Sequence, residues 1–141
     1  MTPVIVANAA LEHAIAHLRG REHAHNRSRL SEASVLQHRL GDLVGRRERT
    51  RALVHHAARR FDAGQPDAAS LVMLAKAEVA DTVVGTVNEA MTLMGGIAYA
   101  ENSAMQRLLR DARAAHVMAP TTDLLRIWVG RTALGEPLLA E

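Results

Sequence analysis

The sequence predicts an all-α protein, and three observations carry that prediction. Apolar residues make up 48% of the 141 residues but aromatic residues only 2%, so alanine and aliphatic side chains must build the core. Apolar residues also recur at helical spacing through long segments, and glycine, proline, serine or threonine stands between those segments. We therefore expect an up-and-down four-helix bundle with an additional short C-terminal helix, formed as one domain over residues 1–141.

The first two helices are predicted from their apolar stripes. The first is expected from Pro3 to His25, followed by a turn from Asn26 to Ser31, and its apolar residues are Val4, Ala7, Leu11, Ala14, Ile15 and Leu18. The second is expected to open at Ser31 and Glu32 and to keep its phase up to Asp62. Its apolar residues are Leu36, Leu40, Leu43, Val44, Val54, Ala57, Ala58 and Phe61. Each helix is thus expected to bury one face.

The third helix is delimited by glycine and proline. Gly64 and Pro66 stop the second helix, so the third is expected from Asp67 to Met94, where Gly95 and Gly96 permit positive φ at the C-cap. Its apolar stripe comprises Leu71, Leu74, Ala75, Val79, Val83, Val87, Ala90, Met91 and Met94. A chain reversal at the glycine pair would bring the next helix antiparallel.

The last two helices carry capping signals. Ser103 with Gln106 three residues on fits a capping box, which predicts that the fourth helix begins near Ala104. Pro120 limits that helix, because the residue before a proline avoids the helical region. The fifth helix is expected to begin at Thr121 or Thr122 and to run toward Gly135.

Composition excludes several classes of protein. The chain has no cysteine, which excludes disulfides, thiolate metal sites and thiol nucleophiles. The first ten residues lack the basic region of a signal peptide, and no apolar run approaches the roughly 20 residues of a membrane helix. A cytoplasmic protein without a membrane partner is therefore expected.

Arginine clusters raise the question of nucleic acid. Glu48 interrupts the densest cluster, no aromatic side chain is interleaved for base stacking, and no known binding motif is present. The arginines concerned are Arg46, Arg47, Arg49, Arg51, Arg59 and Arg60. A solvated or subunit-facing helix surface is the better interpretation, and no nucleic-acid partner is expected.

Neither histidines nor carboxylates predict a site of their own. His13 and His17 lie one helical turn apart and His23 and His25 follow, but the Glu-x-x-His pattern of di-iron bundles is missing, so no metal is expected. The third helix carries three acidic residues, which fall mainly off its apolar stripe and are expected on a solvated face. They are Glu78, Asp81 and Glu89.

One string of residues is more specific than the rest. Gly95 and Gly96 alone predict a helix C-cap, and Arg107, Arg110 and Asp111 alone predict a surface ion-pair ladder. Together, with Arg113, they form Gly-Gly followed by Arg-x-x-Arg-Asp-x-Arg. This string resembles the C-terminal α-helical domain of the acyl-CoA dehydrogenase and flavin-dependent monooxygenase superfamily. The similarity extends outward to Gln-His-Arg-Leu-Gly-Asp-Leu at 37–43 and to Val-Gly-Arg-Thr-Ala-Leu-Gly at 129–135.

The resemblance implies FAD as cofactor, shared with other domains or with a neighbouring subunit. In that family the glycine pair, here Gly95 and Gly96, lets backbone approach the adenosine half of FAD. An arginine after the first helix meets the pyrophosphate; Arg27 is the best match and Arg29 the alternative. By the same resemblance Thr121 offers its hydroxyl to the flavin, and Asp123 shares that surface. Thr92 stands where many members have a glutamine.

The segment that carries the family's base departs from the pattern. Many acyl-CoA dehydrogenases have Glu-Gly-Thr there, and the glutamate removes the α-proton; this chain has Ala119, Pro120 and Thr121. Alanine cannot accept a proton, so no catalytic residue is expected. The related flavin monooxygenases often place histidines here, and His116 is the only candidate, although on an Ala-rich helix a surface or half-buried role is the commoner one.

The resemblance implies a domain of an acyl-CoA dehydrogenase-like, FAD-dependent oxidoreductase that acts on CH–CH groups of acyl-CoA thioesters. The N-terminal helical and middle β domains of that family are absent from the sequence, so the chain is expected to be inactive alone and to contribute FAD contacts and an oligomer interface. Its partners would be copies of itself or a chain that supplies the other domains. The alternatives are a non-catalytic helical scaffold or interaction protein derived from this fold, and a domain of a related flavin monooxygenase.

Overall fold

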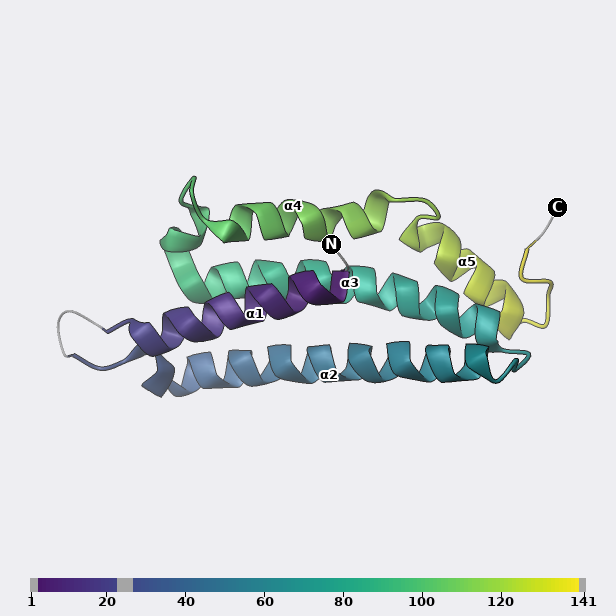
Figure 1. Ribbon diagram of the computed structural model, residues 1–141, viewed down its shortest axis with the longest axis horizontal. Coiled ribbons are helices and arrows are strands. Elements are labelled where there is room, and N and C mark those ends of the chain that lie inside the picture. The colour runs from purple at the N-terminus through teal and green to yellow at the C-terminus, as the bar shows by residue number, and fades with distance from the viewer. Residues whose placement is uncertain (1–2, 23–26, 140–141) are drawn as a thin grey trace.

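The structure is a computed structural model that describes residues 3–22 and 27–139. Over these residues it is all-α, with α1 to α4 side by side as a four-helix bundle and α5 as an additional short helix (Figure 1). The elements are α1 (Pro3–Gly20), the 3₁₀ helix η1 (Leu30–Glu32), α2 (Ser34–Asp62), α3 (Ala68–Met94), the 3₁₀ helix η2 (Gly95–Tyr99), α4 (Ala104–Val117) and α5 (Thr122–Ala133). The predicted fold class is confirmed.

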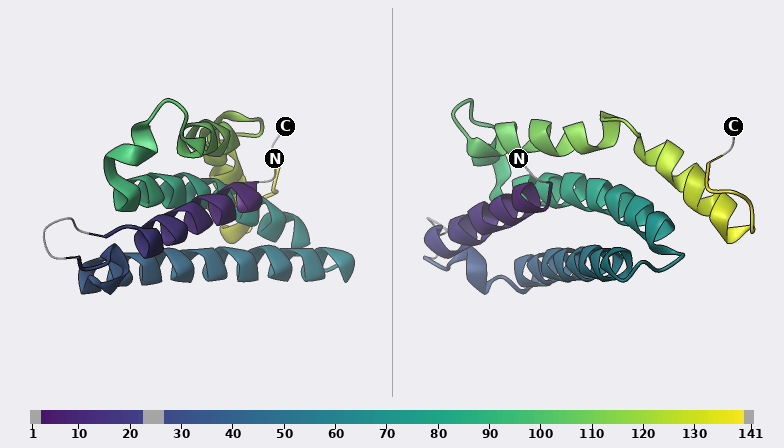
Figure 2. Two further views of the ribbon diagram at one scale, coloured as in Figure 1. Left: turned by 60° about the vertical axis from the view of Figure 1, so that its left-hand side comes forward. Right: turned by 45° about the vertical axis from the view of Figure 1, so that its right-hand side comes forward.

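Helix α3 organises the bundle because it contacts each of the other four α-helices. Figure 2 shows α1 crossing α3 obliquely, with α2 and α4 on opposite sides of the layer that these two helices form. The third predicted helix is confirmed to within one residue, and the predicted starts of the fourth and fifth are confirmed. Within the described ranges, no helix is both long and apolar enough to cross a membrane.

The predicted end of the first helix was wrong. Helix α1 ends at Gly20, and the chain then turns so that Arg21 and Glu22 pair with the segment that precedes α2. The Leu30 amide donates to the Arg21 carbonyl at 3.0 Å, and Glu22 forms an isolated antiparallel bridge with Arg29. These backbone groups are satisfied across the loop instead of along the helix. The rest of the predicted first helix and the first residue of the predicted turn, residues 23–26, lie outside the described residues.

Two predictions about helix starts also need correction. Ser31 and Glu32 belong to η1 and not to α2, because the Glu32 carboxylate accepts from the Arg29 amide at 3.3 Å and closes a separate turn. The capping box before α4 is only half formed. The Ser103 hydroxyl accepts from the Met105 amide at 3.3 Å, but the Gln106 side chain donates to the Ala98 carbonyl at 3.4 Å instead of returning to Ser103.

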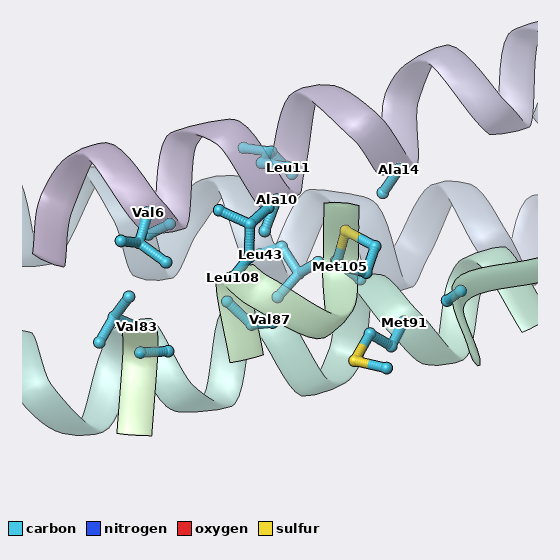
Figure 3. Close-up of a cluster of buried hydrophobic side chains, with 14 of the residues drawn as sticks. Val6, Ala10, Leu11, Ala14, Leu43, Val83, Val87, Met91, Met105 and Leu108 are labelled. Carbon is cyan, nitrogen blue, oxygen red and sulfur yellow. The ribbon is translucent and has the colours of Figure 1, made fainter. Parts of the chain in front are cut away.

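The core lies between α1, α3 and α4, with α2 contributing little (Figure 3). Its largest fully buried side chains there are Val6, Leu11, Leu43, Val83, Val87, Met91 and Met105. The α2 stripe was correct at Leu43 and Ala57, the two buried residues of that helix, and wrong at Ala58 and Phe61. Phe61 is 66% exposed in the last turn of α2, a helix that packs mainly on α3.

Candidate functional site

The glycine pair forms an open turn at the end of α3. Gly95 has φ 67° and ψ −151°, a conformation that side-chain-bearing residues rarely adopt, and its amide donates to the carbonyls of Met91 and Thr92. Gly96 has no such requirement. At either glycine a Cβ would meet no side chain or backbone of the described residues within 4 Å, and both residues are exposed. The backbone of this turn is therefore accessible to a ligand or a partner surface.

The two candidate arginines differ in their surroundings. Arg27 lies in the loop between α1 and η1, is exposed and has φ 56°. Arg29 faces Glu22, with Nε 3.6 Å from Oε1. Among the described residues Arg27 forms no ion pair, so its guanidinium is the freer of the two for an anionic ligand. Helix η1, which follows this segment, lies at the same end of the bundle as the glycine turn (Figures 1 and 2).

The arginines of α4 do not form the expected ladder. Over the described residues, neither Arg107 nor Arg110 pairs with Asp111, and both arginines are exposed. They line a surface groove of about 820 Å³ that follows the outer side of α4. The groove is lined by Glu101, Ser103, Gln106, Arg107, Leu109, Arg110, Arg113, Ala114 and Val117.

The connection between α4 and α5 brings three of the predicted residues together. Thr121 caps α5, its hydroxyl accepting from the Leu124 amide at 3.5 Å, and Asp123 lies in the first turn of that helix. Both line a cavity of about 540 Å³ with His116. The other lining residues are Arg113, Val117, Thr122 and Arg126. A hydroxyl, a carboxylate and an imidazole therefore share one concave surface.

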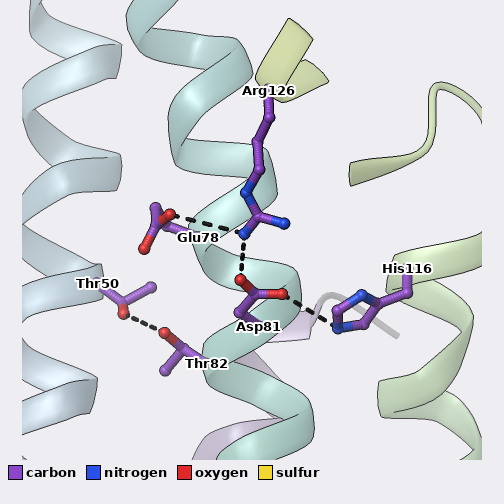
Figure 4. A network of polar contacts seen from close by, with 6 residues as sticks. All are labelled: Thr50, Glu78, Asp81, Thr82, His116 and Arg126. Carbon is purple, nitrogen blue, oxygen red and sulfur yellow. Dashed lines mark hydrogen bonds and ion pairs between the residues drawn. The ribbon is translucent and has the colours of Figure 1, made fainter. Parts of the chain in front are cut away.

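A network of charges fastens this region to α3 (Figure 4). Asp81 Oδ1 lies 3.5 Å from His116 Nε2, and Asp81 Oδ2 forms an ion pair with Arg126, whose Nη2 is also 3.9 Å from Glu78 Oε1. His116 is half-buried, with 19% of its side chain exposed, which agrees with the half-buried role expected for a histidine on an Ala-rich helix. Sequence reasoning missed this network, because its partners come from three helices and share no local motif.

Two of the three acidic residues of α3 lie on a solvated face, as predicted, and the third does not. Glu78 and Asp81 are 46% and 44% exposed, as expected for a solvated face. Glu89 is half-buried instead, because Arg39 from α2 donates to its carboxylate at 2.5 Å. That hydrogen bond and the negative charge of Glu89 raise the pKa of Arg39. Glu89 therefore joins two helices and is not a free acid or base.

An apolar pocket of about 530 Å³ lies beside Ala119, where the resemblance places the base. It is lined by Pro3, Val4, Val54, Ala57, Ala58, Val72, Ala75, Lys76, Val79, Ala80, Ala115, Met118 and Ala119. Of the described residues that line it, Lys76 alone is charged, and its Nζ donates to the Pro120 carbonyl at 2.8 Å. The pocket thus has room for an apolar group, and its described lining contains no carboxylate or imidazole to accept a proton.

No metal centre is found in the part of the chain that the structure describes, where no three histidine, cysteine, aspartate or glutamate side chains converge on one point. His23 and His25 lie outside the described residues. Burial, followed by the charge of Arg21, lowers the pKa of His17. The His13 and His17 pair therefore has no third ligand among the described residues.

Four of the five predicted site residues fall into two groups, and Arg27 lies apart from them in sequence. Gly95 and Gly96 precede α4, and Thr121 and Asp123 follow it, so the 14 residues of that helix separate them by roughly 21 Å at 1.5 Å per residue. Each group is open to solvent. A ligand that touched both would have to be extended, or two ligands or two subunits would have to be involved.

Comparison with known proteins identifies the fold and the family. A family model described as "Acyl-CoA dehydrogenase, C-terminal domain" matches residues 1–134. An acyl-CoA dehydrogenase of Bacillus subtilis is 30% identical over 135 residues, and a probable acyl-CoA dehydrogenase of Mycobacterium tuberculosis is 27% identical over 129. Each match covers 92% of this chain but only 34% and 33% of the relative, so the chain spans about a third of their length.

Solved structures agree with the sequence comparison. The chain superimposes on butyryl-CoA dehydrogenase from Megasphaera elsdenii with a TM-score of 0.85 and 25% identity, covering 94% of this chain and 34% of that one. The helix order and the exposed Gly-Gly turn thus occur in a chain whose sequence matches the family from its first residue to residue 134. This protein belongs to the family of acyl-CoA dehydrogenase C-terminal domains.

Proposed function

We propose that this chain is the C-terminal helical domain of an acyl-CoA dehydrogenase-like, FAD-dependent oxidoreductase that acts on CH–CH groups of acyl-CoA thioesters. One observation carries the proposal: the chain matches such enzymes over 92% of its own length and about a third of theirs. The N-terminal helical and middle β domains would then come from elsewhere in the flavoprotein, in the same chain or in a partner, working in the cytoplasm. The chain by itself would not dehydrogenate a substrate.

The residues at both ends of α4 fit contacts to FAD. At one end, the uncovered backbone of Gly95 and Gly96 suits close approach by the flat adenosine half, since a Cβ at either position would project into open space. At the other end, the Thr121 hydroxyl and Asp123 line a cavity that can hold the edge of a ring. Arg27 is the exposed cation proposed for the pyrophosphate. FAD, when bound, supplies the hydride acceptor.

The acyl group is proposed to lie in or against the apolar pocket beside Ala119. The described residues of the lining include no carboxylate or imidazole, so this pocket could shield the acyl group from water but would not supply the base that removes its α-proton. A base would have to come from the other domains. This is the reason for proposing inactivity of the chain alone and activity only in an assembled flavoprotein.

The exposed apolar surface of α2 and α3 supports self-association or association with a partner chain. Phe61 and Val72 are 66% and 43% exposed and lie on either side of the α2–α3 turn. Exposed apolar side chains of this size are candidates for an interface with another chain. We place the subunit contact at this turn, with Phe61 as its most exposed apolar residue, in a homo-oligomer or in a complex with the chain that supplies the other domains.

The test compares the chain alone with the assembled flavoprotein. We expect the purified chain to contain no FAD and to show no acyl-CoA-dependent dye reduction, and the assembled protein to contain FAD. Stoichiometric FAD with acyl-CoA turnover by the chain alone would contradict the proposal. In the assembled protein, Gly96→Val should weaken FAD binding, whereas Gly41→Val on α2, also in open space, should not.

Two other functions stay open, each favoured by one observation. Ala119 and Pro120, in place of the family's Glu-Gly, favour a helical scaffold that has lost flavin chemistry. His116, which lines one cavity with Thr121 and Asp123, favours a flavin monooxygenase domain. FAD titration of the assembled protein separates the scaffold from the other two, because a scaffold leaves flavin fluorescence unchanged. Oxygen consumption without acyl-CoA dehydrogenation would indicate the monooxygenase.

A further inference from the structure

The segment that joins α4 to α5 is attached to α3 at three points, and two of them meet at one carboxylate. Asp81 faces His116 near the end of α4, at 3.5 Å, and pairs with Arg126 on α5 (Figure 4). Between these two contacts, Lys76 Nζ donates a 2.8 Å hydrogen bond to the Pro120 carbonyl. Helix α3 therefore holds this segment at both ends and in the middle.

The burial of these groups shows what the contacts can do. Asp81 and Arg126 are 44% and 42% exposed, and exposed ion pairs contribute little to global stability. His116 is different, because its Nε2 is buried and forms no hydrogen bond with any described residue. It lies 3.5 Å from the Asp81 carboxylate, a contact that is an ion pair only with a protonated imidazole. A single carboxylate that faces side chains from two helices restrains the distance between them. The Asp81 carboxylate is therefore expected to affect the relative position of α4 and α5 more than the free energy of unfolding.

We propose that Asp81 is a positioning residue for the α4–α5 connection. By holding His116 and Arg126 to one point on α3, it sets where Thr121 and Asp123 stand in the cavity that they line. Its relevance to flavin rests on the proposed function, whereas its effect on the segment is a property of this chain. No motif near Asp81 indicates this role, since its partners lie 35 and 45 residues further along the sequence.

The first experiment uses the full chain and backbone amide hydrogen exchange. Asp81→Asn should lower the protection of residues 117–124 by about threefold to tenfold, the range that loss of one or two exposed charge contacts allows. Protection in the core of α1 and α3 should stay unchanged. The matched control is Asp67→Asn, which removes an Arg60 ion pair of similar exposure at the α2–α3 turn. Unchanged protection of 117–124 in Asp81→Asn, or an equal loss in the control, would overturn the proposal.

A double-mutant cycle tests whether the carboxylate acts through its two partners. His116→Gln should loosen the α4 side and Arg126→Gln the α5 side, each by part of the Asp81→Asn effect. Neither substitution should lower the amide protection further when it is combined with Asp81→Asn, because the shared contact is already lost. A fully additive Arg126→Gln would mean that Arg126 acts through Glu78, 3.9 Å away, and the proposed role of Asp81 would be wrong.

The last readout is FAD affinity in the assembled flavoprotein. Asp81→Asn should raise the dissociation constant of FAD by about threefold to tenfold, in step with the loss of protection, and should lower Tm by no more than about 5 °C. A purely structural role would lower Tm by a similar amount but leave the FAD affinity of the folded fraction unchanged. If the wild-type assembly binds no FAD, the proposed function fails, and the exchange experiment still decides the role of Asp81. If Asp81→Asn binds FAD as tightly as wild type, its positioning role for flavin is wrong.

Discussion

The two ends of α4 are shaped by different interactions. At the N-terminal side, a single backbone conformation at Gly95 makes the turn, and the neighbouring space is open. At the C-terminal side, three side chains of α3 hold the connection through charge and hydrogen bonds: Lys76, Glu78 and Asp81. The first end depends on the steric requirements of one residue, and the second on electrostatics over 35 or more positions of sequence. They should therefore respond to different perturbations.

The largest effect on stability is expected in the core beneath α4, on which both ends of that helix depend. Leu108 lies in the middle of α4, is 3% exposed and packs in the cluster that includes Met105 and Met91. Leu108→Ala should cost about 2–5 kcal/mol of unfolding free energy and loosen both ends together, because a cavity forms beneath the helix. Urea unfolding with an unchanged m-value measures this cost.

The neighbouring residue provides the control for Leu108. Leu109 is of the same type and on the same helix but is only half-buried. Leu109→Ala should therefore cost clearly less than Leu108→Ala. If the two substitutions cost the same, α4 does not present the face to the core that the structure gives it.

A smaller effect, confined to the N-terminal end, is expected at the glycine pair. Gly95→Ala should cost about 1–3 kcal/mol, because φ 67° with ψ −151° is a region that only glycine adopts readily. Gly96→Ala is the matched control, since its φ is ordinary and a Cβ there would meet nothing within 4 Å. It should change stability by less than about 1 kcal/mol. Thermal unfolding of both variants checks the difference, and equal costs would show that the turn depends on something other than φ.

The features that could be predicted from the sequence are those that depend on local interactions, as at the N-terminal side of α4. The end of α3 at Gly95 and the caps Ser103 and Thr121 were predictable, because each depends on residues within about four positions. The capping box failed at Gln106, where the Ala98 carbonyl competes for its side chain. The predicted end of α1 was wrong for a similar reason, because the Arg21 carbonyl accepts a hydrogen bond from the amide of Leu30, nine residues later in the sequence.

The candidate site was predictable only in part. Thr121 and Asp123 could be named from the family resemblance, and they do share a cavity with His116. Asp81 could not, because periodicity places it on a solvated face and nothing local pairs it with α4 or α5. Its partners become visible only when the helices are packed. Long-range charge pairs are thus the part of this site that a sequence without structure leaves out.

The smallest effect on stability is expected at the C-terminal end. Asp81→Asn should cost less than about 1 kcal/mol, because both members of its pair with Arg126 are more than 40% exposed. Since salt screens exposed charges, the difference between wild type and Asp81→Asn should shrink as the salt concentration rises from about 0.01 M to about 1 M. The cost of Gly95→Ala is steric and should not change over that range. Urea unfolding at both salt concentrations measures the two costs together. A salt-independent cost at Asp81, or a salt-dependent one at Gly95, would mean that the two ends of α4 are not held by different interactions.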